Sequence, residues 1–143
     1  MLWLRRAGTL QRFVEFVALV TGASSGIGRA AALAFAQEGA NLARLLVDRG
    51  ADVLVAPSAW VAGERKVDHW RTLVRARAIE NTVYVVAAAQ PGPRYTGHSL
   101  VVDPLGDVLA EAGDGEEAIT ATLDPEVVAR ARETNPSLAN RRM

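Results

Sequence analysis

The sequence predicts an α/β fold in a single domain of 143 residues. Three observations carry this prediction. Short apolar runs rich in β-branched residues alternate along the chain with stretches whose apolar residues recur at helical spacing. A glycine-rich turn, Gly22–Gly28, lies between the first apolar run and the first helical pattern. Half of the residues are hydrophobic, so the chain can bury a core of ordinary size.

Composition and charge exclude several classes of function. The chain has 16 basic and 16 acidic residues, so it offers no basic field for nucleic acid or an anionic membrane surface. It has no cysteine, which excludes disulfides, thiolate metal sites and a cysteine nucleophile in this chain. No unbroken apolar run approaches the ~20 residues of a membrane helix. The first residues lack the apolar core of a signal peptide, and we expect a cytoplasmic protein.

In the first third of the chain, Phe13–Thr21 is typical of a buried strand and the residues after Gly28 are typical of a helix that ends at Gly39. The next stretch, Asn41–Gly50, fits either a helix or a second strand. Its polar residues share one side if it is helical, which favours the helix.

The remaining elements follow from local pattern. We expect strands at Val53–Pro57 and Val83–Ala89, and between them a helix capped by Asp68, with Trp70, Leu73, Val74 and Ala78 on its apolar face. A hairpin turns at Asp103–Gly106 between His98–Val102 and Val108–Glu111. Alternation over Ile119–Leu123 predicts one more strand, and Asp124-Pro125 predicts a helix start. In all we expect six or seven strands.

The segment VALVTGASSGIGRAAALAFAQEGAN, Val17–Asn41, resembles the nucleotide-binding start of a short-chain dehydrogenase/reductase. In that strand–turn–helix context, glycines let the backbone approach a pyrophosphate at a helix N-terminus. The resemblance, which extends over about residues 13–41, implies a Rossmann-like element. It also implies that the cofactor phosphates would lie against five residues of the turn: Gly22, Ser24, Gly26, Ile27 and Gly28.

The rest of that dehydrogenase site is missing. The family's Tyr-x-x-x-Lys pair cannot occur, because the one lysine is Lys66 and position 62 is Ala62. We therefore expect no resident cofactor. NAD(P) would bind only weakly, if the turn binds phosphates at all.

From about residue 42 to 142 the chain resembles the C-terminal half of a nitrilase-superfamily carbon–nitrogen hydrolase. The phrases that carry the resemblance are GAD, PSAW, HW, ARAIEN, GHS and DPLG, in that order, followed by Asn135-Pro136 and Arg141-Arg142. The resemblance implies half of a nitrilase-like αββα sandwich. The whole chain, 1–143, would then be one α/β domain with a dehydrogenase-like part, 1–41, and a hydrolase-like part, 42–143.

Members of that family use a Cys nucleophile, a Glu base and a Lys that stabilises the developing negative charge. The resemblance places all three upstream of the matched segment. At the end of the strand that would carry the cysteine, this chain has Thr21 and Gly22. Lys66 lies in the wrong segment, and Glu80 is expected to pair with an arginine of its own helix. We therefore assign no catalytic residue and no metal ligand.

A few other residues are candidates for a site. Ser24 and Ser25 are expected to be helix caps, and the resemblance makes His69 and His98 structural hydrogen-bonders. Trp60 and Tyr95 resemble residues on the rim of a pocket.

Three interpretations of function stay open: a hydrolase homologue without turnover, a nucleotide-binding module without its reductase site, and a recombined or designed chain. The ligand would be a small amide or a nucleotide. The resemblance also implies a homo-oligomer, in which Leu42–Arg49 and Asp68–Glu80 lie at the subunit interface. We expect Val83, Val85, Ala87, Leu100 and Val102 to form a bare apolar sheet face.

Overall fold

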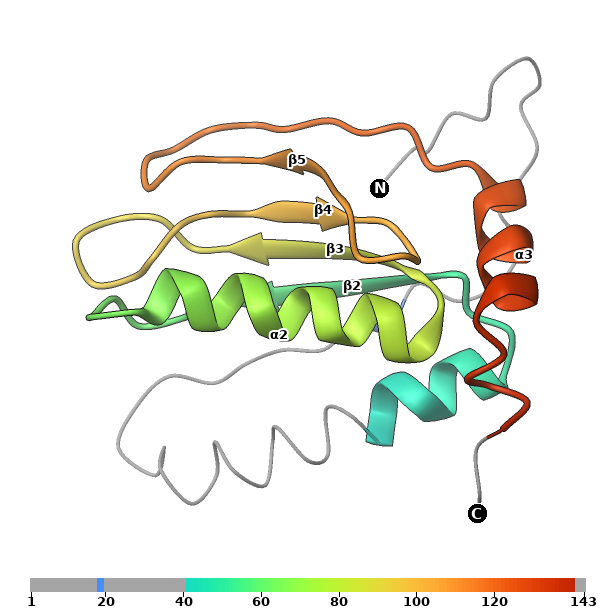
Figure 1. Cartoon of the computed structure of the whole chain (residues 1–143). Coiled ribbons are helices and arrows are strands. Elements are labelled where there is room, and N and C mark those ends of the chain that lie inside the picture. Colours follow the sequence, from blue (N-terminus) through green and yellow to red (C-terminus); the bar gives the residue numbers. More distant parts are fainter. Residues whose placement is uncertain (1–17, 20–40, 141–143) are drawn as a thin grey trace.

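A computed structural model of the chain describes residues 18–19 and 41–140. These residues form one five-stranded sheet of strand order β1-β2-β3-β4-β5. The strands are β1 (Ala18–Leu19), β2 (Val53–Ser58), β3 (Tyr84–Ala89), β4 (Leu100–Val102) and β5 (Val108–Glu111). The helices are residues 41–48, α2 (Lys66–Asn81) and α3 (Pro125–Thr134). The long helix α2 lies along the sheet (Figure 1).

The sheet is mixed because its two halves are connected differently. The strands β1, β2 and β3 are parallel, and the chain returns between β2 and β3 through α2. The strands β3, β4 and β5 are antiparallel, with short connections. The β4–β5 turn is the expected one, since the Gly106 N–H donates to the Asp103 carbonyl at 3.0 Å. The ambiguous segment before β2 is helical over 41–48, as its polar side favoured.

One face of the sheet is covered by α2 and the helix at residues 41–48. Trp70, Val74 and Ala78 of α2 pack with side chains of β2, β3 and β4 in one buried cluster. That cluster includes the five residues expected to form a bare face, Val83, Val85, Ala87, Leu100 and Val102, each at most 3% exposed. The expectation of a bare face there was wrong, because helix α2, which connects β2 to β3, folds back over those alternate side chains.

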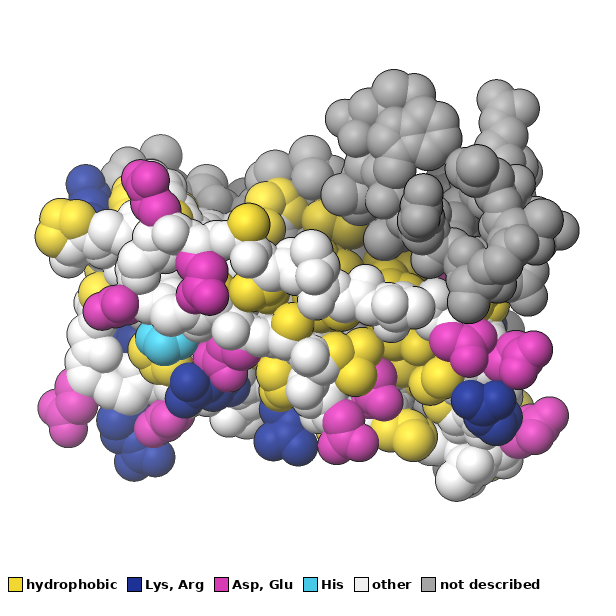
Figure 2. Space-filling view, turned by 90° about the horizontal axis from the view of Figure 1, so that it is seen from above, with side chains coloured by type: hydrophobic (Ala, Val, Ile, Leu, Met, Phe, Trp, Pro, Cys, Tyr) yellow, Lys and Arg dark blue, Asp and Glu magenta, His cyan; other side chains and the backbone are white. Residues whose placement is uncertain are grey.

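The opposite face carries a second cluster, built around Val53, Tyr84 and Val101. Ile119, Ala121 and Leu123 pack against it, so their alternation does bury one side. They do not form the predicted strand, however, because residues 117–124 pair with no strand in the described part of the chain. The described residues therefore contain five strands, where six or seven were expected. In Figure 2, hydrophobic side chains gather in a band beside the atoms that are not described.

Helix α2 begins earlier than its sequence predicts. Its N-cap is Arg65, in a left-handed conformation and without a capping side chain, while Asp68 lies in the first turn. The prediction of Asp68 as the cap was wrong, because the chain already turns at residues 64–65 and the helix begins at Lys66. The Asp68 carboxylate still lies near the positive end of the helix dipole, where a negative charge is favourable. Trp70, Val74 and Ala78 are buried as predicted, but Leu73 is 45% exposed and does not join that face. Asn81 completes the face instead, and its Nδ2 donates to the Arg77 carbonyl at 2.9 Å.

Helix α3 begins as predicted at Asp124-Pro125. The Asp124 carboxylate accepts the Glu126 N–H at 2.9 Å, and Pro125 occupies the first helical position. The Tyr84 hydroxyl donates to the Asp124 carbonyl and accepts the Asp124 N–H, both at 3.1 Å, which fixes the start of α3 against β3. Burial raises the pKa of the Tyr84 hydroxyl, so it stays neutral as a donor. Within the described ranges no helix is long and apolar enough to cross a membrane.

Gly97 lies where two loops cross at close range. Its φ is +63°, and a Cβ built on it would lie 2.9 Å from the Asp114 Cα and from the carbonyl oxygens of Gly113 and Asp114. All three are backbone atoms, so they cannot rotate away. The neighbouring His98 N–H donates to the Gly113 carbonyl at 2.8 Å, which holds the crossing together. Only a glycine fits this position without moving one of the loops.

We expect Gly97→Ala to lower the free energy of unfolding by about 2–4 kcal/mol, because left-handed strain adds to a clash with rigid backbone. Chemical denaturation measures the change. The matched control is Gly115→Ala in the neighbouring turn, where a Cβ meets nothing within 4 Å. That control should change stability by less than about 0.5 kcal/mol. Equal effects from the two substitutions would show that the loops do not cross as described.

Candidate functional site

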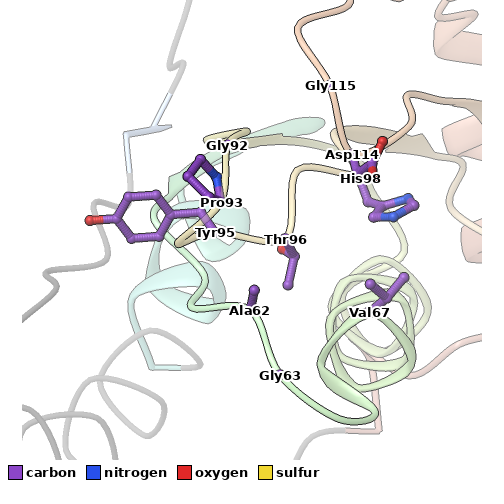
Figure 3. A pocket seen from close by; sticks show the side chains of 10 residues that line it. All are labelled: Ala62, Gly63, Val67, Gly92, Pro93, Tyr95, Thr96, His98, Asp114 and Gly115. Carbon is purple, nitrogen blue, oxygen red and sulfur yellow. The ribbon is translucent and has the colours of Figure 1, made fainter.

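A pocket of about 570 Å³ lies at the carboxyl ends of the parallel strands β2 and β3 (Figure 3). It is lined by residues from the loops after these strands, from the first turn of α2 and from the turn after β5: Ala62, Gly63, Val67, Gly92, Pro93, Tyr95, Thr96, His98, Asp114 and Gly115. Open α/β sheets bind ligands at this edge, because loops from neighbouring strands converge there. The pocket is therefore the candidate site of the described residues.

Backbone hydrogen bonds join the two loops that form the floor of the pocket. The Ala62 N–H donates to the Arg94 carbonyl and the Thr96 N–H donates to the Trp60 carbonyl, both at 2.9 Å. Val61 and Tyr95 pair as an isolated antiparallel bridge between the same loops. These contacts hold the two loops together and occupy the N–H groups of Ala62 and Thr96.

His98 lies in the pocket wall, where its backbone and its side chain both have close partners. Its φ is +56°, which is uncommon for a residue with a Cβ. Its N–H donates to the Gly113 carbonyl at 2.8 Å, and its carbonyl accepts the Trp70 Nε1–H at 2.8 Å. Its Nδ1 is shielded from solvent and lies 3.3 Å from Glu111 Oε1. That contact falls within ion-pair distance but lacks hydrogen-bond geometry.

Glu111 links the pocket wall to helix α2. Its Oε1 accepts a hydrogen bond from Arg71 Nε at 2.7 Å and is the same oxygen that faces His98. The carboxylate is about one-fifth exposed, so solvent weakens this interaction less than it weakens an ordinary surface pair. Arg71, Glu111 and His98 thus form one network that joins α2, β5 and the loop after β3.

The structure tests several of the residues singled out in the sequence. Tyr95 lines the pocket, as the resemblance implied. Trp60 does not line it; its indole packs on Trp70 at 5.9 Å between ring centroids and donates Nε1–H to the Lys66 carbonyl at 2.9 Å. Glu80 pairs with Arg77 of its own helix, as predicted.

The structure does not test the candidates in the glycine-rich turn, and it places the two histidines in different surroundings. The turn residues Gly22, Ser24, Ser25, Gly26, Ile27 and Gly28, with Thr21, lie outside the described residues. His69 is exposed on α2 and is not among the residues that line the pocket, whereas His98 is. Among residues 18–19 and 41–140 no group of three or more His, Cys, Asp or Glu side chains is placed to hold a metal ion.

Sequence analysis missed the pairing of His98 with Glu111. The two residues are 13 positions apart, and the β4–β5 hairpin brings them together. The sequence predicted the hairpin but not its register; in the structure Leu100 lies opposite Glu111, which brings Glu111 close to His98.

Comparison with known proteins places this chain in a family. The family model of carbon-nitrogen hydrolases matches residues 10–133. The deaminated glutathione amidase of a Synechocystis species is 44% identical over 105 residues, which are 70% of this chain and 38% of that protein. The omega-amidase NIT3 of Saccharomyces cerevisiae is 44% identical over 108 residues, 71% of this chain and 36% of that protein.

A solved structure of a related protein also resembles this chain in fold. The NitFhit protein of Caenorhabditis elegans superimposes with a TM-score of 0.67 at 42% identity, over 72% of this chain and 26% of that one. The chain therefore spans well under half the length of these relatives. The family match begins at residue 10, so it includes the segment that resembles a dehydrogenase. The comparisons give no support for that dehydrogenase resemblance. On the strength of the matched length and the shared fold, this chain belongs to the carbon-nitrogen hydrolase family of the nitrilase superfamily.

Proposed function

We propose that this chain is a carbon–nitrogen hydrolase homologue that does not hydrolyse amides by itself. The observation that carries the proposal is the absence of any cysteine from its 143 residues. Hydrolysis in this family, by the resemblance described above, begins with attack of a thiolate on the carbon of the C–N bond. A scaffold without that thiolate keeps the fold and the pocket but lacks the first step.

The environments of the remaining candidates support the same proposal. Lys66 is the one lysine of the chain, and its Nζ lies 5.2 Å from the centre of the Trp60 ring at the start of α2. Glu80 lies in the last turn of α2, paired with Arg77. Neither side chain is among those that line the pocket, so neither is placed to replace the lysine or the base.

We expect no ammonia release above background from small amides, including the ω-amides and deaminated glutathione that the relatives' names suggest. Loss of the nucleophile alone removes about a 10⁶-fold rate enhancement in enzymes that act through such a set. A coupled ammonia assay on the purified chain is the measurement. His98→Gln and Lys66→Ala are the test variants, and steady release that either substitution abolishes would contradict the proposal. Release that co-purifies with the chain over a further chromatography step would also contradict it, whereas release that separates from the chain belongs to a contaminant.

We further propose that the glycine-rich turn, Gly22–Gly28, holds no resident dinucleotide. A cradle for the pyrophosphate without contacts to the base and ribose leaves little surplus affinity after the cost of binding. The TGASSGIG motif is the feature that makes nucleotide binding worth testing.

Calorimetry with NAD(H) and NADP(H) should therefore give dissociation constants no tighter than about 1 mM. The informative variant is Gly26→Val, which adds a side chain where a phosphate would approach the backbone. Micromolar affinity in the unmodified chain, lost in this variant, would overturn the proposal and support the nucleotide-binding interpretation.

We propose that the chain forms a homo-oligomer through its two outer helices. Large apolar side chains project into solvent from both: Leu42 and Leu45 from residues 41–48, and Leu73 from α2, each 38–45% exposed. Both helices cover the same face of the sheet, so these leucines lie on the same side of the molecule. Exposed apolar surface of this kind commonly marks a protein interface, and a two-fold dimer is the simplest closed arrangement.

The double substitution Leu45→Glu and Leu73→Glu should convert the oligomer to a monomer, because it places two charges in the apolar contact. Static light scattering at low micromolar concentration measures the mass. The control is Leu105→Glu, a somewhat more exposed leucine in the β4–β5 turn, which should leave the oligomer intact. A monodisperse monomer of the unmodified chain would refute the proposal.

A further inference from the structure

The pocket contains few groups that can bind a polar ligand. Several of the lining residues have an apolar side chain or none, as in Val67, Pro93 and Gly63. The Thr96 hydroxyl already donates to the Gly97 carbonyl at 3.3 Å. Asp114 is the one charged side chain among the residues that line the pocket, and His98 adds an imidazole. In Figure 3, His98 and Asp114 lie on one side of the pocket and Pro93 and Tyr95 on the other.

The position of His98 is fixed by its backbone. Hydrogen bonds to Gly113 and from Trp70 hold its N–H and carbonyl, and its φ of +56° is a strained conformation for a side chain with a Cβ. A strained backbone conformation persists where the surrounding contacts stabilise it by more than the strain costs. Such conformations are concentrated at binding sites. The backbone of His98 is therefore held in place at the pocket wall.

Glu111 determines which imidazole nitrogen remains for a ligand. Its Oε1 lies 3.3 Å from the shielded Nδ1 and also accepts a hydrogen bond from Arg71 Nε at 2.7 Å. A carboxylate beside Nδ1 favours the tautomer that carries its proton there. In that tautomer Nε2 has a free lone pair and accepts hydrogen bonds.

We propose that this pocket binds a small alkylammonium ligand, with His98 Nε2 and the Asp114 carboxylate accepting its N–H groups. Glu111 is the positioning residue, which holds His98 as the Nδ1–H tautomer. The Tyr95 hydroxyl points away from the other lining side chains (Figure 3), so the remaining side-chain groups are the acceptors of His98 and Asp114, and the complementary head group is a cationic donor. Three cations near the pocket have other partners: Arg71 pairs with Glu111, Arg94 lies over the Tyr95 ring at 5.8 Å, and Lys66 lies over the Trp60 ring at 5.2 Å. This binding does not require amide hydrolysis.

The tautomer is tested by ¹⁵N-detected NMR at about pH 8, above the ordinary range for histidine titration. The chain has two histidines, so His69→Gln assigns the signals. His98 should be protonated at Nδ1 in the unmodified chain and in Arg71→Gln, which keeps the Glu111 carboxylate. Glu111→Gln should shift the population toward Nε2–H. Predominant Nε2–H in the unmodified chain would overturn the role of Glu111.

The ligand is tested with propylammonium and the neutral, similarly shaped 1-propanol at constant ionic strength. Propylammonium should shift the His98 signals saturably, with a dissociation constant on the order of 1 mM, and leave His69 unchanged. Asp114→Asn should weaken binding about threefold or more, while Glu133→Gln, an exposed carboxylate on α3, should not. Equal shifts with 1-propanol, no saturable shift at His98, or equal affinity in Asp114→Asn would each overturn the proposal.

Discussion

The burial of strand β3 is the constraint on which the rest of the structure depends. It is paired on both edges, parallel to β2 and antiparallel to β4, and its side chains at Val85, Ala87 and Ala89 pack beneath α2. Fully burying a valine contributes about 1.5–3 kcal/mol, so this strand and helix hold a large share of the folding free energy. Because β3 ends at Ala89, the following loop leaves the sheet at the edge where the pocket forms.

The sequence alone predicted the elements whose structure depends on residues close together in the chain. Val108–Glu111 is the strand its pattern predicts, and the turn before it closes with the expected glycine. The start of α3 follows equally from Asp124-Pro125, because a capping carboxylate and a proline at the first helical position act within one turn. The family resemblance also identified the hydrolase fold correctly, since its phrases extend over most of the described residues.

The sequence did not predict the features that depend on contacts between residues far apart in the chain. Alternation at Val83, Val85 and Ala87 showed that one side is buried, but it carries no information about which layer buries it. Ile119–Leu123 alternates for the same reason, yet it packs on the sheet without pairing. The pairing of His98 with Glu111 depends on the β4–β5 register and on the tight crossing at Gly97, neither of which has a local signature.

The central claim is that a doubly paired β3 beneath α2 organises this hydrolase scaffold and places the pocket at its edge. Native-state hydrogen exchange tests it most directly, because amide protection reports the free energy of opening at each residue. The amides of Val85, Val86 and Ala87 should be among the slowest to exchange in the chain, and those of residues 117–123 should exchange far faster. Exchange of β3 at the rate of residues 117–123 would contradict the account.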